Sequence, residues 1–277
     1  MSLDWDDVAR VVATALEEDL RYGVDATTEA TVPADAVSTA ELTPRAAGVL
    51  AGVPVALHVF RTVLGDVEVV AQKEDGDKAV PGEPALVLRG PVRGLLTAER
   101  TALNLVCHLS GIATLTAAWV EALEGTGAKV RDSRKTLPGL RLLEKYAVRA
   151  GGGVNHRLGL GDAVLIKDNH VQAAGSVTEA LRQVRAHAPH LPCEVEVDSL
   201  AQLDEAVAQG AELVLLDNFT VADCAEAVRR AQGVKLEASG GLTLDVARAY
   251  AETGVDYLAV GGLTHSAPAL DLGMDLR

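Results

Sequence analysis

Paired cysteines and long apolar runs are both missing from this sequence, and each absence excludes a class of protein. The three cysteines, Cys107, Cys193 and Cys224, lie far apart and form no CxxC pair. This usage argues against a disulfide framework and a structural zinc site, and it favours a reducing cytosol. Because each thiol has apolar neighbours, we predict buried cysteines without a chemical role.

No uninterrupted apolar run approaches the roughly 18–20 residues that are needed to cross a bilayer. The opening stretch, MSLDWDDVARVV, is acidic and amphipathic, unlike a signal peptide. The length of 277 residues suggests one large or two modest domains with a buried core. We therefore expect a cytoplasmic globular protein without a membrane partner.

Positive charge is scarce, with 25 Lys and Arg against 39 Asp and Glu and a formal net charge of −14. This balance argues against nucleic acid and anionic membranes as partners. One window departs from it: Arg131 to His170 holds eight basic and four acidic residues, so the rest of the chain carries −18. Converging cations raise the local potential whatever the total charge, so the window predicts a pocket for a small, highly charged anion.

Residues 1–110 are predicted to form an N-terminal α/β domain. Residues 4–20 place apolar side chains at helical spacing. Short β-like runs separated by Gly/Pro turns then predict an antiparallel sheet between about 36 and 90, built from VSTAELT, GVLAGV, VEVVAQ and PALVLRG. A long helix is predicted over 95–124, which Gly111 could bend or split.

Residues 111–277 are predicted to form an α/β barrel, because apolar β-type runs alternate with helical segments. Ser176-x-x-Glu179 and Ser199-x-x-Gln202 have the form of capping boxes. Six or seven strands suit an incomplete barrel, smaller than the usual eight-stranded one. An open doubly wound sheet is the alternative. The strand runs are AKVRDS, AVLIKD, CEVEVD, ELVLLDN, VKLEASGG and YLAVGG.

Charged residues or glycines end each of these runs, and this favours the barrel. In a parallel barrel the carboxyl ends of all strands open on one face, where active sites of this fold are built. An open sheet would spread the same groups over some 25 Å, at a strand spacing of about 4.8 Å. These residues are Arg134, Lys135, Lys167, Glu196, Asp198, Asp217, Asn218, Glu237, Ser239, Gly261 and Gly262.

Five cationic or titratable residues are expected in the pocket, with Arg100 from the long helix as a sixth. Arg suits planar carboxylates and phosphates, whereas Lys acts as a compact point charge, so the mixture suggests a ligand that carries both groups. Lys167 follows AVLI and would be costly to bury without an anionic partner. The five are Arg134, Lys135, His156, Arg157 and Lys167. A helix-like run nearby is expected to be a solvated or salt-bridged surface instead, and it contains Arg141, Lys145 and Arg149.

Acidic residues form a second set, of which Glu196 and Asp217 are the candidates for chemistry. Carboxylates at the mouth of a cationic pocket could bind sugar hydroxyls or Mg²⁺, or stabilise a developing positive charge. Strand alternation places Glu194, Glu196 and Asp198 on one face. We expect Glu194 and Asp198 to be structural and to form salt bridges, and Glu237 lies nearby.

Two glycine-rich turns follow the last two strands, at Ser239-Gly240-Gly241 and Val260-Gly261-Gly262. Glycine lets backbone N–H groups approach a phosphate closely, and a following helix N-terminus adds a favourable dipole. In barrels the phosphate site is frequently in these final loops. We predict that both turns bind phosphate.

The chain resembles the quinolinate phosphoribosyltransferase family, the decarboxylating nicotinate-nucleotide pyrophosphorylases of NAD biosynthesis. The resemblance covers nearly the whole length and rests on ERTALNLVCHLSGIAT, DSRKTLPGLR, GGGVNHRLGLGDAVLIKDNH, EVEVDS, LLDNF, EASGG and AVGGLTHSAPALDLGMDL. Ser133 stands where the family usually has Thr, which keeps the hydroxyl. Leu137 also replaces a more usual Thr.

By this resemblance the protein is a decarboxylating pentosyltransferase that moves phosphoribosyl from phosphoribosyl pyrophosphate to quinolinate. The products are nicotinate mononucleotide, pyrophosphate and CO₂, and Mg²⁺ is the expected cofactor. The implied fold is an N-terminal open-faced α/β sandwich followed by an incomplete, seven-stranded barrel. A homodimer or a larger homo-oligomer is expected, with Arg100 shared across the interface.

The resemblance also assigns site residues. Quinolinate would be held by Arg134, His156, Arg157, Lys167 and Arg100, with Ser133 as a polar contact. Lys135 and Lys167 would meet the pyrophosphoryl donor, Glu196 and Asp217 would bind ribose and metal, and both glycine-rich turns would bind the 5-phosphate. Lys135, Lys167, Glu196 and Asp217 are the expected catalytic residues.

Three alternatives stay open from the sequence. A Schiff-base barrel aldolase could use Lys167. A related phosphoribosyltransferase could act on another acceptor acid, and a non-catalytic sensor could bind the phosphate ligand alone. The roles of His265 and of the C-terminal tail, which could pack on the first domain, cannot be predicted.

Overall fold

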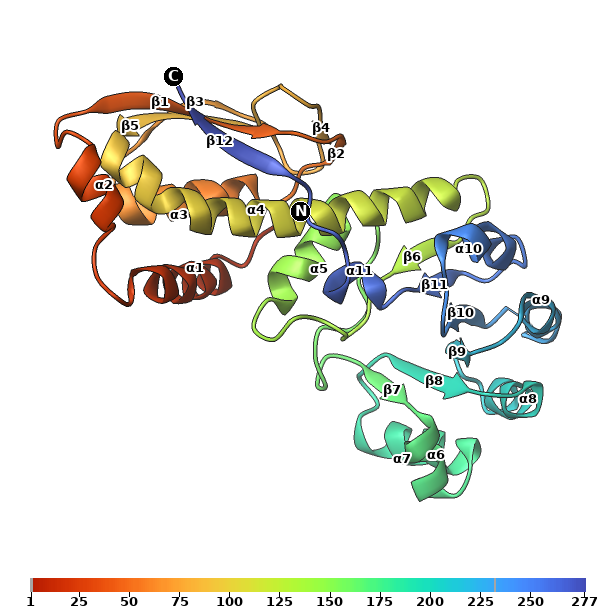
Figure 1. Cartoon of the computed structure of the whole chain (residues 1–277). Helices are drawn as coiled ribbons and strands as arrows, with labels where there is room; N and C mark the ends of the chain where they lie inside the picture. Colours follow the sequence, from red (N-terminus) through yellow and green to blue (C-terminus); the bar gives the residue numbers. More distant parts are fainter. Residues whose placement is uncertain (1, 232) are drawn as a thin grey trace. The chain divides into compact units, whose positions relative to one another are not determined.

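A computed structural model describes residues 2–231 and 233–277 of the chain, which divides into two compact units (Figure 1). The first unit contains the chain up to Ala117, Thr136–Gly152 and Leu263–Arg277. The second contains Ala118–Lys135 and Gly153–Gly262. The first unit therefore takes in a middle segment and the C-terminal segment as well as the N-terminal stretch.

The first unit begins with helix α1 (Trp5–Leu20), which confirms the helix predicted over 4–20. The side chain of Asp4 caps it by accepting a hydrogen bond from the backbone N–H of Asp7. Val8 and Val12 are among the buried residues of its apolar face. A short helix, α2 (Ala26–Thr31), follows.

A four-stranded antiparallel sheet, in the order β12-β1-β5-β3, also belongs to this unit and confirms the sheet that the β-like runs predict. Its strands are β1 (Val37–Pro44), β3 (Glu68–Gln72), β5 (Leu86–Pro91) and β12 (Leu272–Leu276). Strands β2 (Gly48–Val49) and β4 (Lys78–Ala79) form a separate small pair. Because β12 pairs with β1, the C-terminal tail completes this sheet.

Helix α3 (Val53–Leu64) lies between the predicted β-like runs of 36–90, in a stretch for which the sequence analysis predicts no helix. Of the run GVLAGV only Gly48–Val49 is a strand. Pro54 lies in the first helical turn, where its missing N–H costs nothing. Ala56 and Phe60 recur at helical spacing and are fully buried. Burial of this face overrides the strand preference of the valines.

Helix α4 (Val92–Ala122) runs without a break through Gly111, so Gly111 does not split it. A side chain at Gly111 would lie 2.2 Å from the carbonyl oxygen of Pro268. The glycine therefore serves close packing of the C-terminal segment. Within the described residues α4 is the one helix long and apolar enough to cross a membrane, but 56% of its most apolar window is buried. The core helix of a globular protein can be equally long and apolar, so length and composition alone do not identify a membrane-spanning helix.

Helix α5 (Arg141–Ala150) corrects a second prediction, because Lys145 is fully buried and not part of a solvated surface. Glu144 beside it is also fully buried. Its carboxylate lies 2.9 Å from Nε2 of His108 and accepts a hydrogen bond from the N–H of Leu137. The middle segment is thereby tied to α4 within the first unit.

The second unit contains a parallel sheet in the order β6-β11-β10-β9-β8-β7. The strands are β6 (Lys129–Arg131), β7 (Val164–Ile166), β8 (Cys193–Val197), β9 (Leu213–Asp217), β10 (Lys235–Ser239) and β11 (Tyr257–Ala259). The helices are α6 (Asp168–Ala174), α7 (Val177–His187), α8 (Leu200–Ala208), α9 (Val221–Arg230) and α10 (Leu244–Ala251), with α11 (Gly262–His265) at the boundary of the two units. Ser176 and Ser199 cap α7 and α8 through their hydroxyls, as predicted.

The strand order confirms a barrel-like α/β unit, because the first strand, β6, pairs with the last, β11. In an open doubly wound sheet the strand order reverses, so the first and last strands of the chain do not lie side by side. Six strands are described instead of the seven implied, and Val154 forms only a one-residue parallel bridge to Arg131. The polar, glycine-rich GGGVNHR segment around Val154 does not sustain a longer ladder.

The cysteines are free, and burial raises the pKa of all three thiols. Cys224 is fully buried, whereas Cys107 and Cys193 are only partly buried. The prediction of full burial is therefore right for one of the three.

Candidate active site

Alternate residues of the parallel strands face the inside of the barrel and line a pocket of about 450 Å³. Glu196 of β8, Asp217 of β9 and Ser239 of β10 stand at the carboxyl ends of their strands. The predicted site residues that the structure brings together here are Ser133, Arg134, Lys135, His156, Arg157, Lys167, Glu196, Asp217 and Ser239. The pocket also includes Leu165, Leu215, Glu237 and Ala259, which the sequence analysis does not assign to a site.

Two guanidinium groups lie in this pocket, those of Arg134 and Arg157. The Nε atom of Arg134 is buried and has no hydrogen-bond partner. Arg157 donates from Nη1 to the carbonyl oxygen of Ala163 at 3.1 Å. Burial, and then the charge of Arg134, lower the pKa of Arg157. Two desolvated like charges that face one space indicate a site for an anion.

The two lysines lie at the more open part of the pocket. Lys135 is exposed, and a side chain at Gly261 would come within 2.6 Å of its Cδ atom, so this glycine makes room for the lysine. The Nζ atom of Lys167 lies 3.1 Å from Glu196 Oε2, and its side chain is 48% exposed. Lys167 follows β7 rather than lying in it, which leaves its side chain partly exposed, and Glu196 is its anionic partner.

Asp217 and Asn218 connect the ends of β9 and β10. Asn218 has a left-handed backbone (φ 57°), its amide donates to Asp217 at 2.8 Å, and its N–H donates to the carbonyl of Ser239. Gly240 has φ 97°, and a Cβ atom there would lie 2.2 Å from Asn218 Oδ1. Only glycine fits this close approach.

The two predicted phosphate turns differ in what they offer. Gly241 has open space around it, which leaves room for a ligand. Val260 is buried, and its N–H already donates to the carbonyl of Arg131. Gly262 begins α11, a helix of only four residues. The turn at 239–241 is thus the more accessible of the two.

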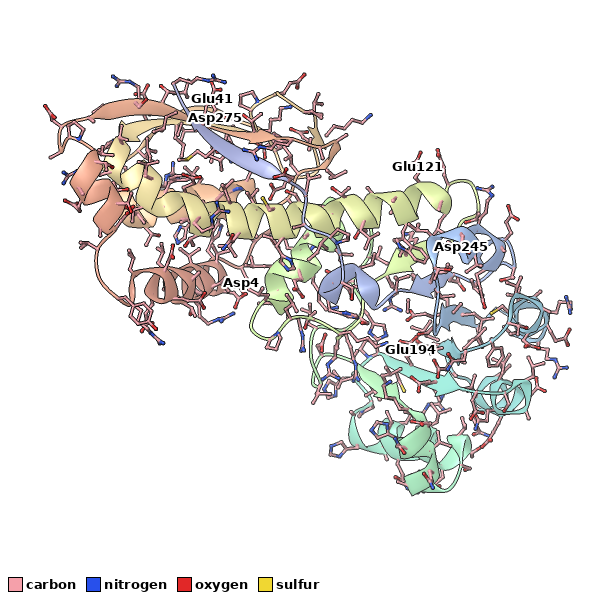
Figure 2. The ribbon with its side chains drawn as sticks, in the orientation of Figure 1. Asp4, Glu41, Glu121, Glu194, Asp245 and Asp275 are labelled. Atoms are coloured by element: carbon pink, nitrogen blue, oxygen red, sulfur yellow. The ribbon has the colours of Figure 1, made fainter. Side chains whose placement is uncertain are left out.

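Charged and titratable residues, most of them buried, lie beside the pocket, and two of them, His156 and Glu237, line it. We call Arg131, Asp132, His156, Glu194 and Glu237 the floor cluster. Asp132 and Glu237 are 0% exposed, Glu194 is 4% and His156 is 8% exposed. Figure 2 labels Glu194 among the strands of the second unit, whereas the exposed Asp245 lies on α10. The floor cluster places three carboxylates against one guanidinium in a region removed from water.

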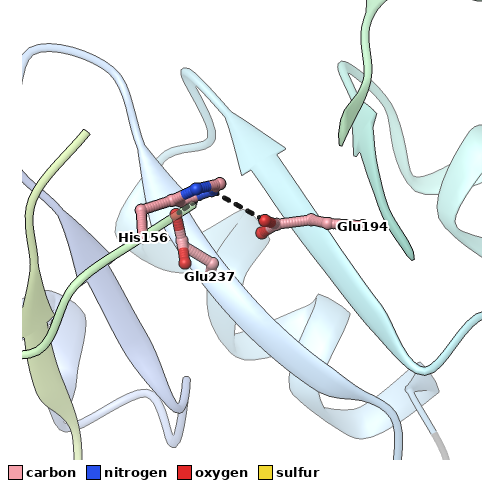
Figure 3. A group of neighbouring side chains, drawn as sticks. All are labelled: His156, Glu194 and Glu237. Carbon is pink, nitrogen blue, oxygen red and sulfur yellow. Dashed lines mark ion pairs between the residues drawn. The ribbon is translucent and has the colours of Figure 1, made fainter. Parts of the chain in front are cut away.

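The contacts of the floor cluster are specific. Asp132 accepts hydrogen bonds from Asn155 Nδ2 at 2.6 Å and from the N–H of His156 at 2.8 Å. His156 Nδ1 accepts from the N–H of Arg157, and Nε2 lies 2.8 Å from Glu194 Oε2. Figure 3 shows His156, Glu194 and Glu237 pointing toward one another.

Glu237 is bonded on one side only. Its Oε2 atom pairs with Arg131 Nη1, and the guanidinium of Arg131 also lies over the ring of Tyr257, 4.7 Å from the ring centroid. Its Oε1 atom is buried without a hydrogen-bond partner, 3.7 Å from His156 Nε2. Burial and the charge of Glu194 raise the pKa of Glu237 from 4.5 to about 8, although Arg131 opposes the shift.

Sequence reasoning named Glu237 at a strand end without giving it a role and missed Arg131 and Asp132, whereas Glu194, expected to form a salt bridge, lies 2.8 Å from His156 Nε2. The signal was present: Glu194, Glu237 and Arg131 stand two positions before Glu196, Ser239 and Ser133, so strand alternation turns each pair to the same side. Asp198 is exposed after β8, where its N–H donates to the side chain of Gln202. No salt bridge of Asp198 occurs among the described residues.

Among the described residues, His156, Glu194 and Glu237 are the one group of three that could hold a metal ion. The guanidinium of Arg131 already occupies one oxygen of Glu237 and would repel a dication. His156 Nε2 is also already at hydrogen-bonding distance from Glu194. This group is therefore better suited to hold a proton than a metal.

Arg100 does not line the pocket. It is exposed on α4 and belongs to the first unit. Its predicted place in the site of a partner subunit stays a prediction, as do the ligand contacts of the other site residues.

Two family models match the chain. Quinolinate phosphoribosyl transferase, N-terminal domain, matches residues 25–110, and its C-terminal domain matches residues 112–275. The chain belongs to the quinolinate phosphoribosyltransferase family. The two models together cover both the sheet of β1, β3 and β5 and the barrel-like unit.

Similar members of the quinolinate phosphoribosyltransferase family come from distant organisms. A nicotinate-nucleotide pyrophosphorylase [carboxylating] of Mycobacterium leprae is 61% identical over 99% of this chain and 98% of its own length. A quinolinate phosphoribosyltransferase [decarboxylating] of Nicotiana tabacum is 36% identical over 98% and 82%. The crystal structure of NadC from Streptococcus pyogenes, 42% identical, superposes with a TM-score of 0.95 over 100% of this chain and 99% of that one.

Proposed function

We propose that this protein transfers the phosphoribosyl group of phosphoribosyl pyrophosphate to quinolinate with loss of CO₂, forming nicotinate mononucleotide in NAD biosynthesis. The observation that carries the proposal is the pair Arg134 and Arg157, which leaves a buried guanidinium N–H without a partner in the pocket. A dicarboxylate acceptor would satisfy both cations at once.

The acceptor side of the site is formed by Arg134, Arg157 and Lys167. Planar guanidinium groups hold carboxylates through paired hydrogen bonds, and Lys167 adds a point charge. His156 precedes Arg157 in the chain, and both of its ring nitrogens face protein groups: Nδ1 faces the N–H of Arg157, and Nε2 faces Glu194. Its main role in the proposal is to hold the backbone N–H of Arg157, in addition to any contact with quinolinate.

The side of the site that would bind phosphoribosyl pyrophosphate, the donor side, is formed by the carboxyl ends of β8, β9, β10 and β11. Glu196 and Asp217 would bind the ribose hydroxyls, and Ser239–Gly241 with Val260–Gly262 would hold the 5-phosphate. Lys135, which lies against Gly261, would meet the departing pyrophosphate. Lys167 leaves Glu196 as the substrates enter, because it then has anionic partners of its own.

Two chemical steps follow from this arrangement. Cleavage of the bond between ribose C1 and pyrophosphate generates an oxocarbenium-like centre, as in glycoside cleavage, and a carboxylate nearby offsets its charge. The pyridine nitrogen then bonds to C1 and becomes a positively charged electron sink. This sink accepts the electron pair that the adjacent carboxylate leaves behind as CO₂.

The residues present fit a bound Mg²⁺ on the donor side. Glu196 and Asp217 supply hard carboxylate oxygens beside a position for substrate phosphates, the ligand set that Mg²⁺ prefers. When bound, Mg²⁺ would neutralise the charge of the departing pyrophosphate. Lys135 would supply part of the same stabilisation without the metal.

A homodimer in the cytoplasm is part of the proposal. The exposed position of Arg100 on α4 leaves its guanidinium available to a partner subunit's pocket. Mixing an Arg100→Ala chain with an inactive Lys135→Ala chain tests this: recovery of part of the activity supports sharing, and no recovery argues against it.

The decisive experiment is release of pyrophosphate and CO₂ from carboxyl-labelled quinolinate with phosphoribosyl pyrophosphate and Mg²⁺. Coupled release of both supports the function. Activity with a pyridine monocarboxylate instead would indicate the related phosphoribosyltransferase, and binding without pyrophosphate release would indicate a sensor. Borohydride trapping would label Lys167 only in an aldolase, and its ion pair with Glu196 makes it a poor nucleophile.

A further inference from the structure

The reaction proposed above consumes a proton that none of the assigned residues supplies. When the bond between the ring and the carboxylate breaks, the electron pair stays on the ring carbon beside the nitrogen. A proton must reach that carbon to form the C–H bond of the product. Arginine cannot provide it at neutral pH, and the two lysines stand at the open part of the pocket.

We propose that Glu237 is the acid that protonates this ring carbon. In this step the carbon–carboxylate bond breaks and CO₂ leaves. The electron pair on the carbon takes the proton of the Glu237 carboxyl group, and Glu237 becomes a carboxylate. The inference rests on the proposed function and adds a catalytic residue to it.

The position of Glu237 meets the geometric requirement. The residue is fully buried, stands on the inner face of β10 two positions before Ser239, and lines the same pocket as Arg134 and Arg157. Its Oε1 atom is buried and has no hydrogen-bond partner in the protein, so no other group holds a proton on this oxygen. Figure 3 shows this carboxyl group beneath the ring of His156.

The charges around Glu237 favour a bound proton before the reaction. Asp132, on the segment after β6, and Glu194, on β8, are negative neighbours, whereas Arg131 from β6 is the positive one. His156, which faces Glu237 from the segment after Val154, accepts a hydrogen bond at Nδ1 from the N–H of Arg157. Three carboxylates against one cation in a buried site make protonation of one of them favourable.

Arg131 also stabilises the product of the step. After the proton has left, the Glu237 carboxylate stays paired with the guanidinium of Arg131. A second cavity of about 260 Å³ lies toward the other end of the strands and is lined by Arg131, His156, Glu194 and Lys235 among others. Arg131, His156 and Glu194 are the neighbours of Glu237, so this cavity brings solvent to the residues around the Glu237 carboxyl group.

The test separates the two chemical steps in a single turnover. In Glu237→Gln, CO₂ release from carboxyl-labelled quinolinate should fall about 100-fold behind pyrophosphate release, the usual scale of general acid catalysis. Quinolinate mononucleotide should accumulate. In mixed H₂O and D₂O, the deuterium content at the protonated ring carbon should also differ from that of the wild type. The control Glu252→Gln removes an exposed carboxylate paired with Arg248 and should behave as the wild type does.

CO₂ release that keeps pace with pyrophosphate in a folded Glu237→Gln protein would overturn the proposal and leave the proposed function standing. Absence of pyrophosphate release from the wild type would instead overturn the function. If the Glu237→Gln protein does not fold, the pH dependence of CO₂ release by the wild-type protein tests the proposal instead. Its CO₂ step should slow as the pH rises through about 8, where the raised pKa of Glu237 predicts loss of the acid form. A CO₂ step that does not slow between pH 7 and 9.5 would also overturn the proposal.

Discussion

Removal of the Arg157 guanidinium tests the acceptor side of the site most directly. The free enzyme holds Arg157 near Arg134, and burial together with this like charge lowers the pKa of Arg157. Arg157→Ala therefore removes an unfavourable interaction from the free enzyme. It removes a favourable one from the quinolinate complex, because a carboxylate loses its partner.

The magnitude follows from the energy of a buried charged pair. Truncation of one partner typically costs about 2–5 kcal/mol, and each 1.36 kcal/mol corresponds to a factor of ten in rate. We expect kcat/KM for quinolinate to fall about 30- to 5,000-fold. The thermal unfolding midpoint should stay unchanged or rise, because the same substitution relieves repulsion in the free enzyme. Steady-state kinetics with quinolinate varied at saturating phosphoribosyl pyrophosphate measure the effect.

Two comparisons make the result interpretable. Arg157→Lys keeps the charge but loses the planar fork and should recover part of the activity. Arg182→Ala removes an exposed arginine that is paired with Glu179 and should change little. Values of kcat/KM within threefold of the wild type for Arg157→Ala would refute the role, and so would an equal loss of affinity for phosphoribosyl pyrophosphate.

Three further outcomes are expected. Gly111→Ala should lower the free energy of unfolding by about 1–3 kcal/mol, because its Cβ would overlap the backbone at Pro268. Thermal unfolding measures this effect. The control is Gly161→Ala, whose Cβ would meet open space. Gly240→Ala should raise KM for phosphoribosyl pyrophosphate about tenfold, since its left-handed backbone and Asn218 both oppose a side chain; an unchanged KM would contradict the phosphate role of this turn. Chelation of divalent metal should stop pyrophosphate release, and Mg²⁺ should restore it better than Ca²⁺, whose larger, flexible coordination suits the site less; full activity with chelator would exclude the metal.

The parallel strands of the second unit could be predicted because their signals are local. Each is a short apolar run followed by a charged or glycine-rich turn, and buried parallel strands carry this pattern. Helix α3 could not be separated from a strand in the same way. Its valines favour either structure, and the choice is made by burial of Phe60 and its neighbours in the first unit.

Lys145 shows a different limit of sequence reasoning. Charged residues at helical spacing in RLLEKYAVRA usually form a solvated face. Glu144 and Lys145 are instead both fully buried, and Glu144 contacts His108, which is 36 positions earlier in the chain. A contact of this range leaves no trace in the local pattern, so only the folded structure reveals it.

The site residues also fall into a group that the sequence predicts and a group that only the folded structure reveals. Arg134, Lys167, Glu196 and Asp217 stand at strand ends, where the barrel rule predicts function from position alone. The floor cluster obeys another rule, which the structure makes visible: in a narrow parallel barrel, the residue two positions before a site residue faces the same interior. On β7, β9 and β11 that position is apolar, as Leu215 is before Asp217, and on β6, β8 and β10 it is charged. At Glu237 it is charged, and burial together with the charge of Glu194 raises its pKa, so this residue, although paired with Arg131, becomes a candidate for proton transfer.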